Sequence, residues 1–279
     1  MQLAPLDNET IFKQAFTDKE VFQAFVKDLF GVDIVVDTIE TEKRFQPPIA
    51  DIDIKLDIYA ESNDHRFVIE IQKIDYDYNF NRFLNYFISL LLEQQKKASR
   101  YAIPQTVLGV VVLTRPYKID QLTGEPIQES VMQIDFDPRN LKDERIKIWN
   151  HTLLFLNPNP KYRDPEIPQN YQDWLNLFSA SIDKNINIVL NFNNKGIAKA
   201  SKIIQYENLD PRILEEMKIS EEKKAMVSII KEENFAKGEH SKAIKIAEKM
   251  IKAGKSIDEI AEFTELSIEI IQKLTNHLK

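Results

Sequence analysis

Asp51-Ile-Asp-Ile-Lys-Leu-Asp-Ile-Tyr59 and Arg66-Phe-Val-Ile-Glu-Ile-Gln-Lys73 are the two segments that decide the fold. In the first segment apolar and polar residues alternate strictly, which is the period of a half-buried β-strand. In the second segment Glu70 and Gln72 share one face. Short polar residues between the segments favour a turn, so an antiparallel hairpin is predicted. The expected buried face of the first segment consists of Ile52, Ile54, Leu56 and Ile58.

The polar side chains of this hairpin would gather oxygen ligands at one place. Glu70 and Gln72 are two residues apart, so they point the same way and lie roughly 7 Å apart along the strand. Pairing of the strands can bring Asp57 to the same point. Two carboxylates and an amide oxygen suit Mg²⁺ or Mn²⁺. Spacing alone favours the alternative, a solvated face of an antiparallel sheet, because acidic residues are common on exposed strand faces.

Asp57, a short turn and then Glu70-Ile-Gln72 resemble the D…ExQ form of the PD-(D/E)XK nuclease motif. More narrowly, the chain resembles the PD-(D/E)XK family transposases, also called recombination-promoting nucleases. The resemblance implies an α/β, restriction-endonuclease-like core, which is a mixed sheet flanked by helices. It also implies that Asp57 and Glu70 hold a divalent metal ion and that Gln72 places the attacking water. Gln is usual here in the subfamily, although it cannot act as a general base.

The first helix predicted in the chain resembles the opening of the same family. It begins near Asp7, and Glu9 stands where an acidic residue is sometimes an accessory metal ligand. The alternative for Glu9 is an ordinary first-turn carboxylate, which the helix dipole favours. Lys55 shares a strand face with Asp57 and could reach a phosphate, and a cross-strand salt bridge is its alternative.

A helix predicted after the hairpin resembles the family's Arg- and Tyr-bearing helix, with Phe87 in place of its second Tyr. Arg82 and Tyr86 are four residues apart and would lie together. Arg82 could clamp the scissile phosphate or orient Glu70, because a guanidinium suits either role. The alternatives are an ion pair of Arg82 with Asp75 or Asp77 and a packing role for Tyr86.

Composition limits the class of protein. The chain has 279 residues, is 43% hydrophobic and contains no cysteine, so disulfides and cysteine-ligated zinc are excluded and a cytoplasmic location is expected. No basic, apolar leader and no stretch of about 20 apolar residues is present, so neither a signal peptide nor a membrane partner is expected. The net charge of -7 argues mildly against nucleic-acid binding, although a local basic rim and a bound metal ion can offset it.

The remaining patterns predict an α/β domain followed by helices. Residues 1–165 are expected to form the nuclease-like domain and residues 166–279 a helical region. Within it, 240–279 resembles a helix-turn-helix, but few of its side chains could read DNA, so packing or homo-oligomerisation is favoured. Helices are predicted at 7–16 and 18–30, and strands at 34–45, 107–113, 131–136 and 146–149, with 153–156 closing the domain.

The sequence leaves three functions to weigh. The leading hypothesis is a Mg²⁺- or Mn²⁺-dependent endonuclease that hydrolyses phosphodiester bonds of DNA and is associated with mobile-element recombination. Its catalytic residues would be Asp57, Glu70, Gln72 and Arg82. The second is a catalytically weak or inactive nuclease-fold protein that acts as a DNA- or protein-binding adaptor. The third is a helical oligomerisation protein whose working part is the tail at 199–279.

Overall fold

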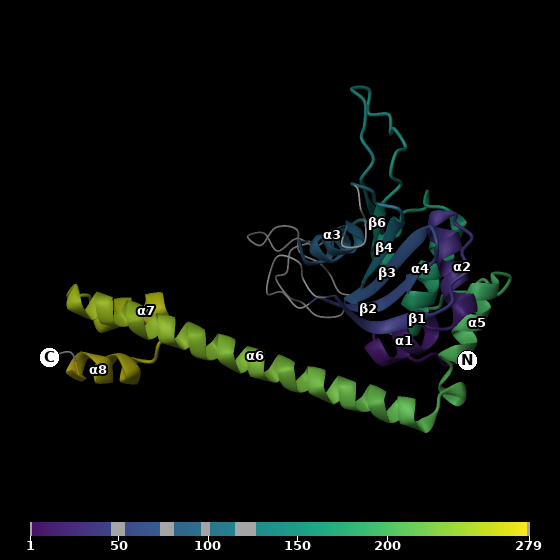
Figure 1. Ribbon diagram of the computed structural model, residues 1–279. Helices are drawn as coiled ribbons and strands as arrows, with labels where there is room; N and C mark the ends of the chain where they lie inside the picture. Colours follow the sequence, from purple (N-terminus) through teal and green to yellow (C-terminus); the bar gives the residue numbers. More distant parts are fainter. Residues whose placement is uncertain (1, 46–53, 73–80, 96–100, 115–126, 278–279) are drawn as a thin grey trace. The chain divides into compact units, whose positions relative to one another are not determined.

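The computed structural model describes residues 2–45, 54–72, 81–95, 101–114 and 127–277 (Figure 1). The predictions for residues 51–53 and the alternative partners Asp75 and Asp77 lie outside these residues. The chain divides into two compact units, Met1–Met217 and Lys218–Lys279.

The first unit is built on a mixed sheet with the strand order β1-β2-β3-β4-β6-β5. The first three strands pair antiparallel, β4 lies parallel to both β3 and β6, and β5 is antiparallel to β6. The predicted α/β class with a mixed sheet is therefore confirmed. The described strands are β1 Ile39–Phe45, β2 Ile54–Glu61, β3 His65–Gln72, β4 Thr106–Leu113, β5 Val131–Asp135 and β6 Thr152–Leu156.

Helices cover both faces of the sheet (Figure 1). Phe67 and Ile69 of β3 pack into a first hydrophobic cluster, whereas Val68 packs into a second. This alternation places the helices of the two clusters on opposite faces. The first cluster contains side chains of α1 (Glu9–Phe16), α2 (Lys19–Phe30), α4 (Gln169–Ile182) and α5 (Lys195–Ile203), and the second contains those of α3 (Asn81–Gln95).

Capping residues determine where the first two helices begin and where the second ends, as the sequence predicts. The Asn8 side chain accepts hydrogen bonds from the first turn of α1, and the Asp18 side chain does the same for α2. Gly31 ends α2 in a left-handed conformation, with φ of 69°. These caps position α1 and α2 over the sheet.

The boundary between the units lies after Met217, later than the predicted boundary at residue 165. The reason is that α4 and α5 belong to the core of the first unit. Trp174 is fully buried, and its indole N–H donates to Asp28 Oδ2 at 2.7 Å. Asn194, the N-cap of α5, donates to the same carboxylate oxygen at 2.8 Å. One aspartate on α2 thus holds both later helices.

The strand predicted at 146–149 is wrong. The carboxylate of Asp137 accepts hydrogen bonds from the backbone N–H groups of Ile148, Trp149 and Asn150 at 2.7–3.1 Å. Those donors would pair with a neighbouring strand in a sheet. The segment therefore forms an irregular connection between β5 and β6.

The second unit is helical. It holds most of α6 (Pro211–Lys252) together with α7 (Ile257–Thr264) and α8 (Ile268–His277). The Ser256 hydroxyl caps α7 by accepting from the Glu259 N–H, as the sequence predicts. Within the described residues no helix is both long enough and apolar enough to cross a membrane. A small core joins the helices, made of Ala247, Ile260, Leu266 and Ile271.

Gly196 provides a test of the close contact between α2 and α5. A Cβ atom at Gly196 would lie 2.4 Å from Ala24 Cβ and 3.0 Å from Trp174 Cζ2. Because this packing has no room to adjust cheaply, Gly196→Ala is expected to lower the free energy of unfolding by about 1–3 kcal/mol in chemical denaturation.

Gly238→Ala is the matched control, because nothing lies within 4 Å of a new Cβ there. It lies in α6, where Ala favours the helix by up to about 1 kcal/mol over Gly. Equal effects of the two substitutions would contradict the tight packing inferred for Gly196.

Candidate active site

The backbone hydrogen-bond ladder between β2 and β3 ends at two carboxylates, which accept backbone N–H groups in place of carbonyl oxygens. Backbone pairing of the described strands runs as far as Ile58 and Ile69. At the next position the Asp57 N–H donates to Glu70 Oε1 at 2.9 Å, and the Ile71 N–H donates to Asp57 Oδ2 at 2.9 Å. Each carboxylate thus takes a backbone donor that a regular ladder would give to a carbonyl. The two acidic side chains predicted to converge are therefore brought together.

Asp57 also lies where β2 changes face. Leu56 packs into the cluster that contains α3, whereas Ile58 packs into the opposite cluster. The single buried face predicted for Ile54, Leu56 and Ile58 is wrong for this reason. On β1, Glu42 lies between the partners of these two residues and has φ of 57°. A non-glycine residue in this left-handed region costs roughly 1–3 kcal/mol, and such strain is concentrated at functional sites.

Both carboxyl groups resist ionisation. Glu70 is only 2% exposed. Its burial, and then the neighbouring charge of Asp57, raise the pKa of Glu70 well above its usual value, although the Asp57 N–H and Arg82 act against the rise. Burial also raises the pKa of Asp57, against the lowering effect of the Ile71 N–H. Like charges in a buried site produce this pattern, and a divalent cation would reverse it.

Gln72 and Arg82 meet beside the carboxylates. Gln72 follows Glu70 on the same face of β3, and its Oε1 accepts from Arg82 Nη1 at 3.3 Å. Arg82 Nε donates to the Tyr86 hydroxyl at 2.9 Å, so Tyr86 orients the guanidinium as well as packing. The charge of Arg82 lowers the pKa of both Asp57 and Glu70. The structure therefore brings the predicted Arg82 to the site, held by two partners.

Lys13 is a site residue that the sequence reasoning missed. Its ammonium pairs with Glu9 at 2.5 Å and with Glu42 at 2.9 Å. Burial alone would lower the pKa of Lys13, but these two partners raise it. Its charge also lowers the pKa of Asp57. The i, i+4 spacing from Glu9 predicts the first ion pair. The resemblance that makes Glu9 a possible accessory metal ligand already implies that α1 lies next to Asp57, but it gives Lys13 no role.

Glu9 and Lys55 are held by ion pairs in the structure. Glu9 lies near enough for its charge to raise the pKa of Asp57, and it forms an ion pair with Lys13. Lys55 pairs with Glu42 at 3.1 Å across the β1–β2 strands, which is the cross-strand salt bridge that the sequence left open.

The donor set fits a hard divalent cation with two acidic ligands. Among the residues that the structure describes, no group of three His, Cys, Asp or Glu side chains could hold a metal ion. The candidate ligands are instead the carboxylates of Asp57 and Glu70 with the amide oxygen of Gln72. Oxygen ligands of this type suit Mg²⁺ or Mn²⁺. The convergence of two buried carboxyl groups, each fixed by a backbone N–H, favours a cation there, because their burial and like charge raise the pKa of both.

No family model, no curated protein and no solved structure matches this chain. A proposal for the function therefore rests on the arrangement of Asp57, Glu70, Gln72 and Arg82.

Removing the charge of Glu70 should stabilise the fold at neutral pH. Because its folded-state pKa lies above the ordinary value of 4.5, the folded protein binds more protons than the unfolded chain above that pH. The contribution of the Glu70 carboxyl to the free energy of unfolding is therefore fully present below about pH 4.5. It is lost as the pH rises through the folded-state pKa. Glu70→Gln is therefore expected to raise the free energy of unfolding at pH 7 by on the order of 1 kcal/mol, with no gain at pH 4.

Asp137→Asn is the control with the opposite sign. Burial alone would raise the pKa of Asp137, but three backbone N–H groups and Arg145 lower it. Its contribution is present above the unfolded-state pKa and is lost in acid, so Asp137→Asn should destabilise the protein at pH 7 and less so as the pH falls. If Glu70→Gln destabilised the protein at pH 7 as Asp137→Asn does, the proposed charge repulsion at Glu70 would be refuted.

Proposed function

We propose that this protein is a metal-dependent DNA endonuclease that hydrolyses phosphodiester bonds at Asp57 and Glu70. The observation that carries the proposal is the pair of carboxylates in the gap of the β2–β3 ladder, both with a raised pKa. A buried pair of this kind, placed with an amide and a guanidinium, is typical of a functional site.

Asp57 and Glu70 would hold the metal ion, Mg²⁺ or Mn²⁺. When bound, such an ion supplies a water of lowered pKa and offsets negative charge on the phosphate. The N–H groups of Asp57 and Ile71 fix one oxygen of each carboxylate, which keeps the two side chains in place. Gln72 cannot take a proton at neutral pH, so its part is to orient the water through its amide.

Positive charge at the site comes from two helices. Arg82 on α3 is oriented by Gln72 and Tyr86, and its fork suits a phosphate oxygen. Lys13 on α1 acts on Asp57 from its own helix and supplies a cation that Gln72 cannot. These two cations partly offset the negative charge of Asp57 and Glu70 at the site.

The wider proposal includes the fold family, the partners and the location. A mixed sheet with helices on both faces supports a restriction-endonuclease-like PD-(D/E)XK core. The link to mobile-element recombination and the cytoplasmic location rest on the sequence. DNA is the proposed partner. Exposed apolar side chains of α6 support a homo-oligomer formed through the helical region, namely Ile219, Met226, Val227, Ile229 and Ile230.

A nuclease-fold adaptor with weak or no cleavage is the alternative. The net charge of -7 and the absence of a lysine at the position of Gln72 favour it. Such a protein would keep the carboxylate pair and bind DNA or protein without hydrolysis.

Cleavage of supercoiled plasmid tests the proposal. The wild-type protein is expected to nick or linearise plasmid with Mg²⁺ or Mn²⁺ and not with EDTA. Glu70→Gln keeps the size of the side chain and the acceptor for the Asp57 N–H but removes the charge that holds the metal ion. It is therefore expected to reduce the cleavage rate at least about 100-fold, the loss typical of removing one electrostatic contact to the transition state.

Asp64→Asn is the matched control, since Asp64 is an exposed carboxylate in the turn of the same hairpin. It should cleave like the wild type. Equal cleavage by Glu70→Gln and the wild type would show that Glu70 does not act in the reaction. Metal binding at Asp57 and Glu70 without any cleavage would instead favour the adaptor.

A further inference from the structure

The connection between α4 and α5 is unusually apolar for a segment without regular structure. Ile186-Asn-Ile-Val-Leu-Asn-Phe192 contains five large apolar residues, and no helix or strand is formed by it. Val189 is 88% exposed and Phe192 is 53% exposed. Apolar side chains at this exposure commonly mark a binding surface when they gather at one place.

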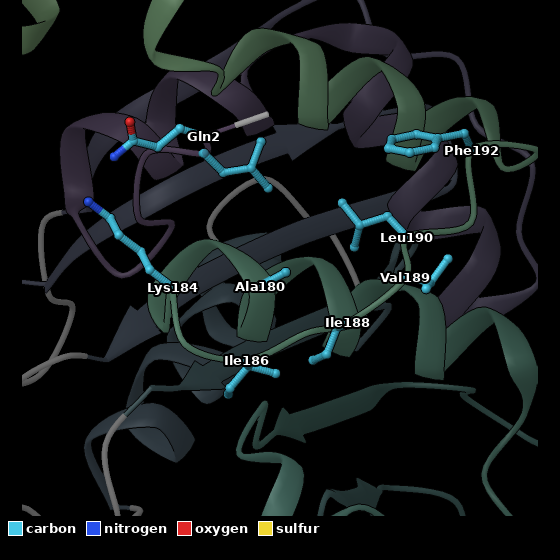
Figure 2. A pocket seen from close by; sticks show the side chains of 9 residues that line it. Gln2, Ala180, Lys184, Ile186, Ile188, Val189, Leu190 and Phe192 are labelled. Carbon is cyan, nitrogen blue, oxygen red and sulfur yellow. The ribbon is translucent and has the colours of Figure 1, made fainter.

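These side chains line a pocket in the first unit. It has a volume of about 530 Å³, within the range of small-molecule sites. Figure 2 shows side chains from the connection on one side and residues of the N-terminal segment on another. None of the residues that line it belongs to the carboxylate site. The lining residues are Gln2, Leu3, Ala180, Lys184, Ile186, Ile188, Val189, Leu190 and Phe192.

The walls of the pocket are held by backbone hydrogen bonds. On the N-terminal side, the Tyr206 N–H donates to the Gln2 carbonyl at 3.2 Å, and Ala4 N–H donates to the Ile204 carbonyl at 2.7 Å. On the other side, the Ile186 N–H donates to the carbonyl of Asp183 at 3.3 Å, which fixes the start of the connection. A pocket whose walls are already fixed loses little entropy when it binds a ligand.

The polar groups of the pocket gather at one end. Figure 2 shows the Lys184 ammonium and the Gln2 amide on the same side of the pocket, whereas the side chains of Ile186, Ile188 and Phe192 lie away from them. No acidic residue lines the pocket. In the described part of the chain no carboxylate pairs with Lys184, whose ammonium lies 5.5 Å from the centre of the Tyr206 ring.

The geometry points to a binding site for an aliphatic carboxylate, a molecule with a hydrocarbon chain and one anionic end. The chain would cover Ile186, Ile188 and Phe192, and the carboxylate would meet Lys184 and Gln2. Burial of the apolar surfaces supplies most of the affinity, and the charge fixes the direction in which the ligand lies. This site is independent of the proposed nuclease activity.

Calorimetric titration of the full chain tests the site with three probes that each carry a ten-carbon chain, the two ionic ones below their micelle-forming concentrations and the alcohol below its solubility limit. These are decanoate, decan-1-ol and decyltrimethylammonium. Decanoate is expected to bind about fivefold more tightly than decan-1-ol, since a partly exposed ion pair contributes up to about 1 kcal/mol. The cationic probe is expected to bind most weakly.

Two variants separate the charge from the apolar pocket. Lys184→Gln should bring decanoate to the affinity of decan-1-ol and leave decan-1-ol unchanged. Lys195→Gln, an exposed lysine of the same unit outside the pocket, should keep the fivefold preference. Ala180→Leu should fill the pocket and weaken both probes about tenfold, with its folding checked by thermal unfolding.

Three results would overturn the proposal. They are no binding of any probe, equal affinity of the wild type for decanoate and decan-1-ol, or a preference that survives Lys184→Gln. Because Lys184 is exposed, its substitution should leave the fold intact even if Ala180→Leu does not fold.

Discussion

Two carboxylates occupy a gap in a β-ladder, and the surrounding elements are arranged about them. Asp57 and Glu70 each accept a backbone N–H from the other strand, which fixes both side chains but brings two like charges together in a buried place. Arg82 from α3 and Lys13 from α1 partly offset that charge. Glu42 holds Lys13 from a strained backbone conformation. The site is thus built at some cost in stability, which is expected where function requires it.

The parts of this site that lie close in sequence could be predicted from it. The two-residue spacing on β3 places Glu70 and Gln72 on one face. The polar turn between the two strands predicts a hairpin, which brings Asp57 opposite them. The i, i+4 spacing joins Arg82 to Tyr86. These predictions depend only on the residue spacing within one strand or one helix, which sets the direction of each side chain without any tertiary contact.

Other features depend on tertiary contacts and could not be predicted. The change of face at Asp57 coincides with the end of the β2–β3 pairing, and no alternation pattern encodes it. Asp137 captures three backbone donors from residues 148–150 and prevents the strand that their apolar pattern predicts. Asp28 ties α4 and α5 to α2, so composition alone places the domain boundary too early. In each case a single aspartate outweighs local propensity.

Titration of the carboxyl groups by ¹³C NMR, with and without Mg²⁺, tests most directly whether Asp57 and Glu70 form a metal site. Without Mg²⁺ the Glu70 carboxyl is expected to ionise well above pH 4.5 and to respond to the ionisation of Asp57. With Mg²⁺ both groups should ionise at lower pH, because the cation offsets their repulsion. Ordinary titration of both groups, unchanged by Mg²⁺, would contradict the account.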